Sequence, residues 1–446
     1  MELISEALAG FATGLNLDSV PEAVTRRAKL SILDAVGTAL LSSRLEKSKQ
    51  SAKAVRRVSS GGESAAWGLR FSASPLESAL VNGMLIEGLD YSDIHVGAGL
   101  HPTSVILPAV AAIGETKGAS GGEVLLGHLI GCETMIRLGL SAPGNFHAHG
   151  VQPTSAVGVL GSSLAASRMM GLPPRKAEEA LSLATTLAFG SSLSVRVGAY
   201  FGGVDSGRAA ESGMLAAILA REGVTGIARD SIEGRFGFLE TCVGAGNYDA
   251  KRITKRLGSA WEMKDIFLKR YPTSYACTPT IDAAVRIGSA DGFKTEEIEE
   301  VRFGENAPNI GLFSEPEESK RRPASLYDAK TSQYFLLSLA LTFGRVTPQM
   351  LQTKLKDKAV LELSDKVGYV LDEKSHWVEV KMKDGRVVRE IEDRLVPTSE
   401  VAVRRKFREN SVLALGQERT SRIESMVDSL EELSDIGELT SLLKAS

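Results

Sequence analysis

Apolar residues recur every three or four positions over most of the first half of the chain, which is the spacing of helices with a buried face. Residues 3 to 15 and 21 to 43 predict two such helices, and Pro21 stands where a first-turn proline is expected. Further segments of helix length follow between residues 75 and 225, rich in alanine and glycine and ended by glycine or proline. Because many are apolar nearly all round, we expect them to be buried within a helical bundle.

The pattern changes after about residue 260. The segment "IEEVRFGEN", which begins at Ile298, alternates like a strand, and "HWVEVKMKDGRVVREIED" (376 to 393) alternates on both sides of Asp384-Gly385. That pair predicts a two-residue hairpin turn.

Helical spacing returns in "SEVAVRRKFREN" (399 to 410) and in residues 422 to 443. We therefore predict a mainly α fold in which an all-helical domain is split around a smaller inserted α+β domain. The helical domain comprises residues 1 to 257 and 397 to 446, and the α+β lid comprises residues 258 to 396.

Composition agrees with a large soluble protein. The chain has 446 residues, enough for two to three domains, and 43% of them are hydrophobic but only 6% aromatic. The formal net charge of −3 predicts a protein without a polyanion-binding surface, so no nucleic-acid partner is expected. No apolar run reaches the roughly 18 residues needed to span a bilayer, so no membrane partner is expected either.

The cysteines indicate a reducing compartment. Cys132, Cys242 and Cys277 lie far apart without a CxxC spacing, which disfavours a disulfide framework or a zinc site. The N-terminus carries acidic residues early and lacks the basic region of a signal peptide. We expect a cytoplasmic protein.

Candidate chemistry is concentrated in "EGLDYSDIHVGAGLHPTSVILPAV" (87 to 110). The glycines and Pro102 end a helix there, so its aspartates and histidines cluster in the following loop, a normal place for catalytic groups. The plainer alternative, a capping aspartate and histidines bound to loop carbonyls, stays open. The polar residues in question are Asp90, Asp93, His95 and His101.

Three other stretches offer polar groups. "GNFHAHGVQPTS" (144 to 155) holds two histidines, which alone make a poor metal site. "RVGAYFGGVDSGRAAESG" (196 to 213) leads into a helix whose N-terminus favours an anion, but it lacks the P-loop lysine. "KRYPTSYACTPTIDAA" (269 to 284) supplies hydroxyl groups before another helix. A surface loop or a helix cap explains each of them equally well.

Together these stretches resemble the 2-methylcitrate dehydratase (MmgE/PrpD) superfamily, which includes cis-aconitate decarboxylase and iminodisuccinate epimerase. The matches run in order through nearly the whole chain: "AKLSILDAVGTAL", "GLDYSDIHVGAGLHPTSVILPA", "GVQPTSAVGVLGSSLAASRMMGL", "SGRAAESGMLAAILAREGVTG", "KRYPTSYACTPTIDAA" and "YDAKTSQYFLLSLALTFGRV". The resemblance implies a homodimer that acts on a small carboxylate substrate without a metal or organic cofactor. It also implies proton abstraction next to a carboxylate, followed by loss of water, loss of CO2 or reprotonation. We expect a lyase or isomerase, and a dehydratase first.

Residue by residue, the resemblance places Asp90, Asp93 and His101 at the family's acidic and histidine positions. We therefore expect His101 to be the general acid or base, with the two aspartates orienting it or a substrate hydroxyl. The expected substrate-binding residues lie in the same four stretches: His95, His149, Gln152, Asp205, Arg208, Tyr275 and Thr278.

The chain departs from the family's pattern at four positions that are usually basic: Gln152, Gly202, Asp205 and Thr278. Three explanations follow. The site is rebuilt for another substrate, with His95, His147, His149, Arg196 or Arg208 supplying charge and proton transfer. Alternatively, the protein binds a small acid without turning it over, or it is an inactive paralogue that serves as a partner subunit.

Overall fold

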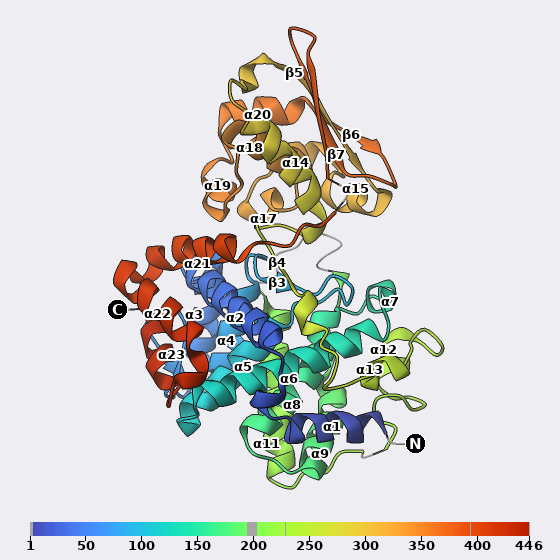
Figure 1. Ribbon diagram of the computed structural model, residues 1–446, viewed down its shortest axis with the longest axis vertical. Coiled ribbons are helices and arrows are strands. Elements are labelled where there is room, and N and C mark those ends of the chain that lie inside the picture. The colour runs from blue at the N-terminus through green and yellow to red at the C-terminus, as the bar shows by residue number, and fades with distance from the viewer. Residues whose placement is uncertain (1–2, 194–202, 228, 393, 446) are drawn as a thin grey trace.

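A computed structural model describes residues 3–193, 203–227, 229–392 and 394–445. Arg196 and Gly202, both named above, lie outside the described residues. The chain forms a larger part made of helices and a smaller part that carries a four-stranded sheet (Figure 1). Buried apolar side chains form two clusters; the second is centred on the smaller part but includes Leu41, Leu89 and Tyr91 of the larger part.

The larger part contains the helices that the apolar spacing predicts, and most of them are buried. Pro21 is the N-cap residue of the second helix rather than its first-turn residue. The helices are α1 (Ile4–Gly14), α2 (Glu22–Ser42), α3 (Glu46–Val58), α4 (Pro75–Glu87), α5 (Thr103–Lys117), α6 (Gly121–Leu140), α7 (Asn145–Ala148), α8 (Pro153–Met169), α9 (Pro174–Leu187), α11 (Val204–Arg221), α12 (Phe238–Val243) and α13 (Lys251–Thr254).

Glycine in these helices permits close backbone contact, which explains the alanine- and glycine-rich sequence. A Cβ added to Gly83 of α4 would lie 2.6 Å from the Cα of Gly207 in α11. A Cβ on Gly207 would in turn collide with the backbone oxygen of Leu80. The N-terminus of α11 is therefore held against the C-terminal half of α4.

The C-terminal helices α21 (Glu400–Leu415), α22 (Gln417–Asp428) and α23 (Gly437–Leu443) return to the larger part (Figure 1). Phe407 of α21 is fully buried, and a Cβ on Gly37 of α2 would lie 3.1 Å from the Phe407 Cα. The helical segment predicted at 422 to 443 is interrupted between α22 and α23.

The smaller part packs helices on one sheet with the strand order β6-β5-β7-β8. β5 and β6 are parallel, and the other neighbours are antiparallel. Buried side chains of β5 and β7, including Val301, Phe303 and Val378, belong to the same apolar cluster as α14 and α18. The elements are α14 (Thr278–Gly288), β5 (Ile298–Glu305), α15 (Ala307–Phe313), α16 (Glu317–Arg321), α17 (Leu326–Ala329), α18 (Gln333–Phe343), α19 (Pro348–Thr353), α20 (Lys358–Asp365), β6 (Val367–Leu371), β7 (Trp377–Met382) and β8 (Val387–Ile391).

The predicted hairpin is present, but its loop has three residues, so the two-residue turn is wrong. The N–H of Met382 donates to the carbonyl of Arg386, and the N–H of Gly385 donates to the carbonyl of Met382. Gly385 adopts a φ of +87°, the left-handed conformation that closes a three-residue loop. Asp384 and Gly385 do lie in the turn, as predicted, but Lys383 belongs to the loop as well.

The structure contains two short strand pairs that the sequence did not predict, and the second of them joins distant segments. β1 (Ser64–Ala65) pairs with β2 (Ser72–Ala73), and β3 (Asp93–Ile94) pairs antiparallel with β4 (Phe267–Leu268). The β3–β4 pair lies where the two parts meet (Figure 1). The domain boundaries drawn from the sequence stay a prediction. Among the described helices, none is long and apolar enough to cross a membrane.

Candidate active site

The candidate site forms where α4 ends and the chain turns toward β3. Asp90 adopts a left-handed φ of +51°, which turns the chain within three residues of Glu87. The backbone of His95 then bridges to Leu100, closing a short loop that brings His101 back beside α4. Pro102 follows and caps α5. The loop predicted from the glycines and Pro102 is therefore correct.

Both nitrogens of His101 have defined surroundings. Its Nδ1–H donates to the backbone carbonyl of Asp93 at 2.7 Å, which fixes the tautomer and leaves Nε2 as the proton acceptor. Nε2 lies 3.8 Å from a carboxylate oxygen of Glu87 and 3.8 Å from one of Asp90. The backbone N–H of His101 donates to Thr154 at the start of α8. Burial, with the charge of Lys269, lowers the pKa of His101, so the ring is neutral near pH 7.

The two carboxyl groups beside His101 differ in charge. Burial, assisted by the negative charge of Asp90, raises the pKa of Glu87 to about 8, so Glu87 is a neutral acid at pH 7. Burial is the largest single influence on Asp90 and would raise its pKa, but Lys269, Lys330 and His101 together outweigh burial and lower that pKa. Lys269 forms an ion pair with Asp90 and donates to its backbone carbonyl. The site thus holds a neutral base, a neutral acid and an ionised carboxylate side by side.

Lys269 reaches the site because β4 pairs with β3. Leu268 is in register with Asp93, so the next residue, Lys269, emerges beside the turn at Asp90. Its side chain is only 2% exposed. A buried ammonium needs a carboxylate partner, and Asp90 supplies it.

Two further charged groups face the same cluster. Asp205, at the start of α11, carries a raised pKa because of burial, and its charge also raises the pKa of Glu87. The ammonium of Lys330, which follows α17 in the smaller part, acts in the opposite direction on Glu87, Asp90 and Asp205. Within the described part of the chain, Lys330 forms no ion pair closer than 4.0 Å. Because Lys269 is already paired with Asp90, Lys330 is the ammonium group of the cluster that is available to bind the carboxylate of a ligand.

Asp93 contributes through its backbone as well as its carboxyl group. Its carbonyl orients His101, while its side chain accepts a hydrogen bond of 2.7 Å from the hydroxyl of Thr103. Burial raises the pKa of Asp93 to about 7. The side chain is completely buried, so we assign it to positioning within the protein.

A second buried ion pair lies behind the cluster. Lys406 of α21 lies 2.8 Å from Asp34 of α2, and both side chains are buried. The same ammonium donates to the backbone carbonyls of Tyr91 and Lys269. Lys406 therefore ties the C-terminal helix to both segments that carry the candidate site.

Other residues singled out in the sequence lie outside this cluster or at its edge. His95 is buried, accepts a hydrogen bond from the backbone of Ala98, and responds to the charges of Glu262 and Asp265 instead. His149 is exposed, and its ring contacts the carbonyl of Asn145, as the surface-loop alternative expected.

Arg208 is also exposed and pairs with Glu211 on the same helix. Thr278 is the buried first residue of α14, and Tyr275 lies in the turn before it. Gln152 is the buried N-cap residue of α8, two residues before the Thr154 that contacts His101. Their assignment to substrate binding stays a prediction.

Three groups of the cluster were not among the predicted site residues: Glu87, Lys269 and Lys330. Glu87 is the first residue of the stretch that the sequence singled out, and Lys330 lies in "YDAKTS", one of the segments that carries the family resemblance. Lys269 opens the Tyr-Pro segment. All three therefore lie in segments that the sequence analysis had singled out. Only the pairing of strand β3 with strand β4 shows that Lys269 is the partner of Asp90.

A metal ion is a weak fit for the cluster. Glu87, Asp90 and His101 each offer one ligand atom, and these atoms lie within 4.8 Å of one another. However, Lys269 already neutralises Asp90, and a divalent cation would have to lie beside its ammonium. The donor set suits proton transfer on an anionic molecule better.

Comparison with known proteins defines the family. The sequence model of the MmgE/PrpD N-terminal domain matches residues 6–251, and that of the MmgE/PrpD C-terminal domain matches residues 271–432. The chain belongs to the MmgE/PrpD family, which confirms the resemblance found in the sequence.

Curated relatives match the chain over almost its whole length. It is 27% identical to the cis-aconitate decarboxylase-like protein oryM of Aspergillus oryzae, over 99% of this chain and 97% of the relative. It is 27% identical to the cis-aconitate decarboxylase of Mus musculus and 28% identical to that of Homo sapiens. Both alignments cover 100% of this chain, with 94% of the mouse and 95% of the human protein.

Proposed function

We propose that the protein is a lyase that acts on a small di- or tricarboxylate by acid–base chemistry at His101 and Glu87. The observation that carries the proposal is the 3.8 Å separation between Nε2 of His101 and a Glu87 carboxyl group whose pKa is raised to about 8. A neutral base beside a neutral acid can remove a proton from one atom and supply one to another near pH 7. The cis-aconitate decarboxylases to which the chain is similar support this class of reaction.

The positive charge of Lys330 suits it to bind a substrate carboxylate. Lys269 is enclosed and already paired, whereas Lys330 is half-buried and faces the cluster from the smaller part. A substrate held by Lys330 would lie between the two parts, with His101 and Glu87 on the side of the helices. We therefore propose that the smaller part acts as a lid over the site.

The relatives make decarboxylation of cis-aconitate the first reaction to test. Loss of CO2 leaves an electron pair on the carbon skeleton, and one proton must then be added to carbon, for which Glu87 is the nearby donor. Dehydration of a hydroxy acid, which the family resemblance first suggested, uses the same groups: His101 removes the proton next to the carboxylate, and Glu87 protonates the departing hydroxide.

The experiment is proton NMR of the purified protein incubated with cis-aconitate, citrate and 2-methylcitrate. We expect at least one acid to be converted, and His101→Gln to lower the rate by about two to four orders of magnitude. The variant should melt within a few degrees of the original protein, because the histidine contributes little to the apolar core. The matched control is His376→Gln, which removes a histidine that pairs with Glu305 in the smaller part and belongs to none of the candidate stretches, and it should leave the rate within about twofold.

Two results would contradict the proposal. Calorimetric binding of these acids without turnover would favour the alternative, a non-catalytic binding protein or partner subunit. Full activity of a folded His101→Gln variant would mean that the proton transfer takes place elsewhere. Lys330→Met tests substrate binding separately, since it should raise KM more than it lowers kcat.

A further inference from the structure

A cavity lies away from the candidate active site, where the C-terminal end of α2 meets α19 of the smaller part. Its volume is about 730 Å³, within the roughly 300 to 1,000 Å³ typical of small-molecule sites. None of its lining residues belongs to the cluster around His101. It is therefore a separate space.

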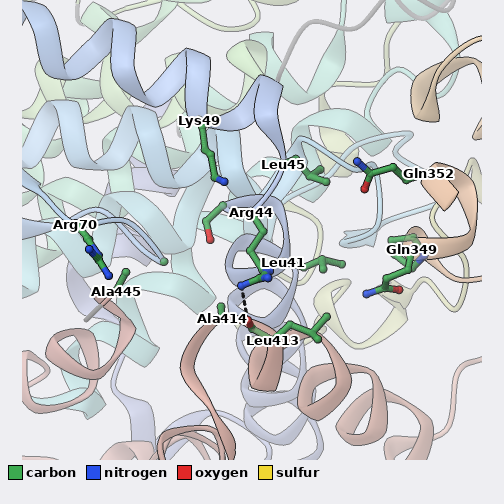
Figure 2. A pocket seen from close by; sticks show the side chains of 13 residues that line it. Leu41, Arg44, Leu45, Lys49, Arg70, Gln349, Gln352, Leu413, Ala414 and Ala445 are labelled. Atoms are coloured by element: carbon green, nitrogen blue, oxygen red, sulfur yellow. Dashed lines mark hydrogen bonds between the residues drawn. The ribbon is translucent and has the colours of Figure 1, made fainter.

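The charged side chains that line this cavity are all positive. Arg44, Lys49 and Arg70 line it, and among its lining residues in the described chain none is acidic (Figure 2). Figure 2 shows Arg44 and Lys49 on neighbouring walls and Arg70 on the opposite side from Gln349 and Gln352. The glutamine amides add uncharged hydrogen-bond donors.

The three cations also lack carboxylate partners. In the described residues, none of them lies within 4.0 Å of an Asp or Glu oxygen, although Arg44 donates to the backbone carbonyl of Leu413. By contrast, Arg26 of α2 forms an ion pair with Glu400. Three unpaired cations around one hollow, in a chain of net charge −3, repel one another unless an anion joins them.

We propose that this cavity binds a small organic polyanion, a phosphate ester or a polycarboxylate with two or three negative charges. Two guanidinium groups can each bind a phosphate or carboxylate group through two hydrogen bonds, and Lys49 adds a third charge. The overall charge had argued against a polyanion-binding surface, and the cavity is a local exception to it. A bound anion would contact both α19 and the α2–α3 turn, so it would hold the two parts of the molecule together.

The test is calorimetric titration with pyrophosphate at low ionic strength, with citrate as a second probe. Pyrophosphate represents the phosphate class and citrate the carboxylate class. Because citrate is also a candidate substrate at the His101 site, only the part of each affinity that the pocket variant removes identifies the chemistry preferred by the cavity. We expect saturable binding with one pyrophosphate per chain. The triple variant Arg44→Gln, Lys49→Gln, Arg70→Gln should weaken it at least tenfold, because each charged hydrogen bond contributes measurably to affinity.

The matched control removes three exposed cations elsewhere: Arg229→Gln, Lys383→Gln and Arg386→Gln. It changes the net charge equally and should leave the affinity within about twofold. If the pocket triple variant does not fold, Lys49→Gln and Arg70→Gln are measured singly, since neither side chain makes a described hydrogen bond. Each should weaken binding about threefold or more.

Hydrogen exchange locates the ligand independently of activity. Pyrophosphate should slow exchange in residues 41–49 and 348–353, and the His101→Gln variant should show the same protection. Absence of saturable binding at millimolar concentration would overturn the inference. So would equal weakening in both triple variants, or protection confined to the segment around His101. The proposed lyase activity would be unaffected by any of these results.

Discussion

The neutral state of Glu87 predicts a specific pH dependence of stability. Burial and the charge of Asp90 raise the pKa of Glu87 from 4.5 to about 8 in the folded protein. Between these two pH values the folded protein keeps a proton that the unfolded chain has released. Raising the pH through this window therefore favours unfolding, and the stability from the raised pKa is lost as the pH passes 8.

The expected magnitude follows from proton linkage. One proton difference corresponds to about 1.4 kcal/mol per pH unit. Between pH 4.5 and about 8 the loss of unfolding free energy therefore reaches at most roughly 5 kcal/mol. The loss is smaller if local opening of the structure lets water reach the Glu87 side chain. Glu87→Gln removes this titration, so the difference in unfolding free energy between the original protein and the variant should fall with pH up to about 8 and then become constant.

Urea unfolding at several values between pH 5 and 9 provides the measurement. Trp67 and Trp261 are buried in the helical core, so their fluorescence in a Trp377→Phe background reports on the part that contains Glu87. The control is Glu123→Gln, because the backbone N–H of Ser120 lowers the pKa of Glu123. Its contribution is lost only as the pH falls below the ordinary value of 4.5, so the Glu123→Gln difference should stay constant between pH 5 and 9.

A pH-independent difference between the original protein and Glu87→Gln would refute the reasoning. It would show that Glu87 is ionised in the folded state at neutral pH. The proposed proton donor would then be absent. Activity offers a second reading, since the rate should fall about tenfold per unit above pH 8 as the neutral acid disappears.

Further predictions concern the support of the site and the assembly. Lys406→Met should destabilise the protein by about 3 to 5 kcal/mol in denaturant unfolding, because it leaves Asp34 buried without its partner; the double variant with Asp34→Leu should recover most of this loss. Gly203→Ala should cost more stability and activity than Gly118→Ala. Both glycines have positive φ, but only at Gly203 would the new Cβ lie 2.6 Å from the backbone oxygen of Met84. Sedimentation should give twice the 47.5 kDa chain mass at micromolar concentration, and a monomer there would contradict the predicted homodimer.

The sequence predicted the fold well wherever the pattern is local. Helical spacing located the buried helices, and the alternating runs located β5, β7 and β8. Apart from local details such as the length of the hairpin loop, the main failure concerns the pairing of distant segments. The β3–β4 pair is only two residues long on each side, too short to leave an alternation, and its partners are separated by more than 170 positions. No local pattern contains that information.

The same limit explains how the candidate site was only half predicted. His101, Asp90 and Asp93 belong to one loop, so a single stretch of sequence reveals them together. The substitutions at Gln152 and Thr278 suggested that positive charge had been lost from the site. The structure instead supplies positive charge from Lys269, through the β3–β4 pair, and from Lys330, through the smaller part.

Electrostatic balance makes this redistribution a physical requirement. Glu87, Asp90 and Asp205 converge on a buried space, and three carboxyl groups could not all remain there as anions without cations nearby. The cluster solves this by pairing Asp90 with Lys269 and by keeping a proton on Glu87. The proposed chemistry depends on the net charge at the site, and residues far apart in the sequence can provide the positive charge. The absence of a cation at one family position is therefore a poor indicator of whether this chain is active.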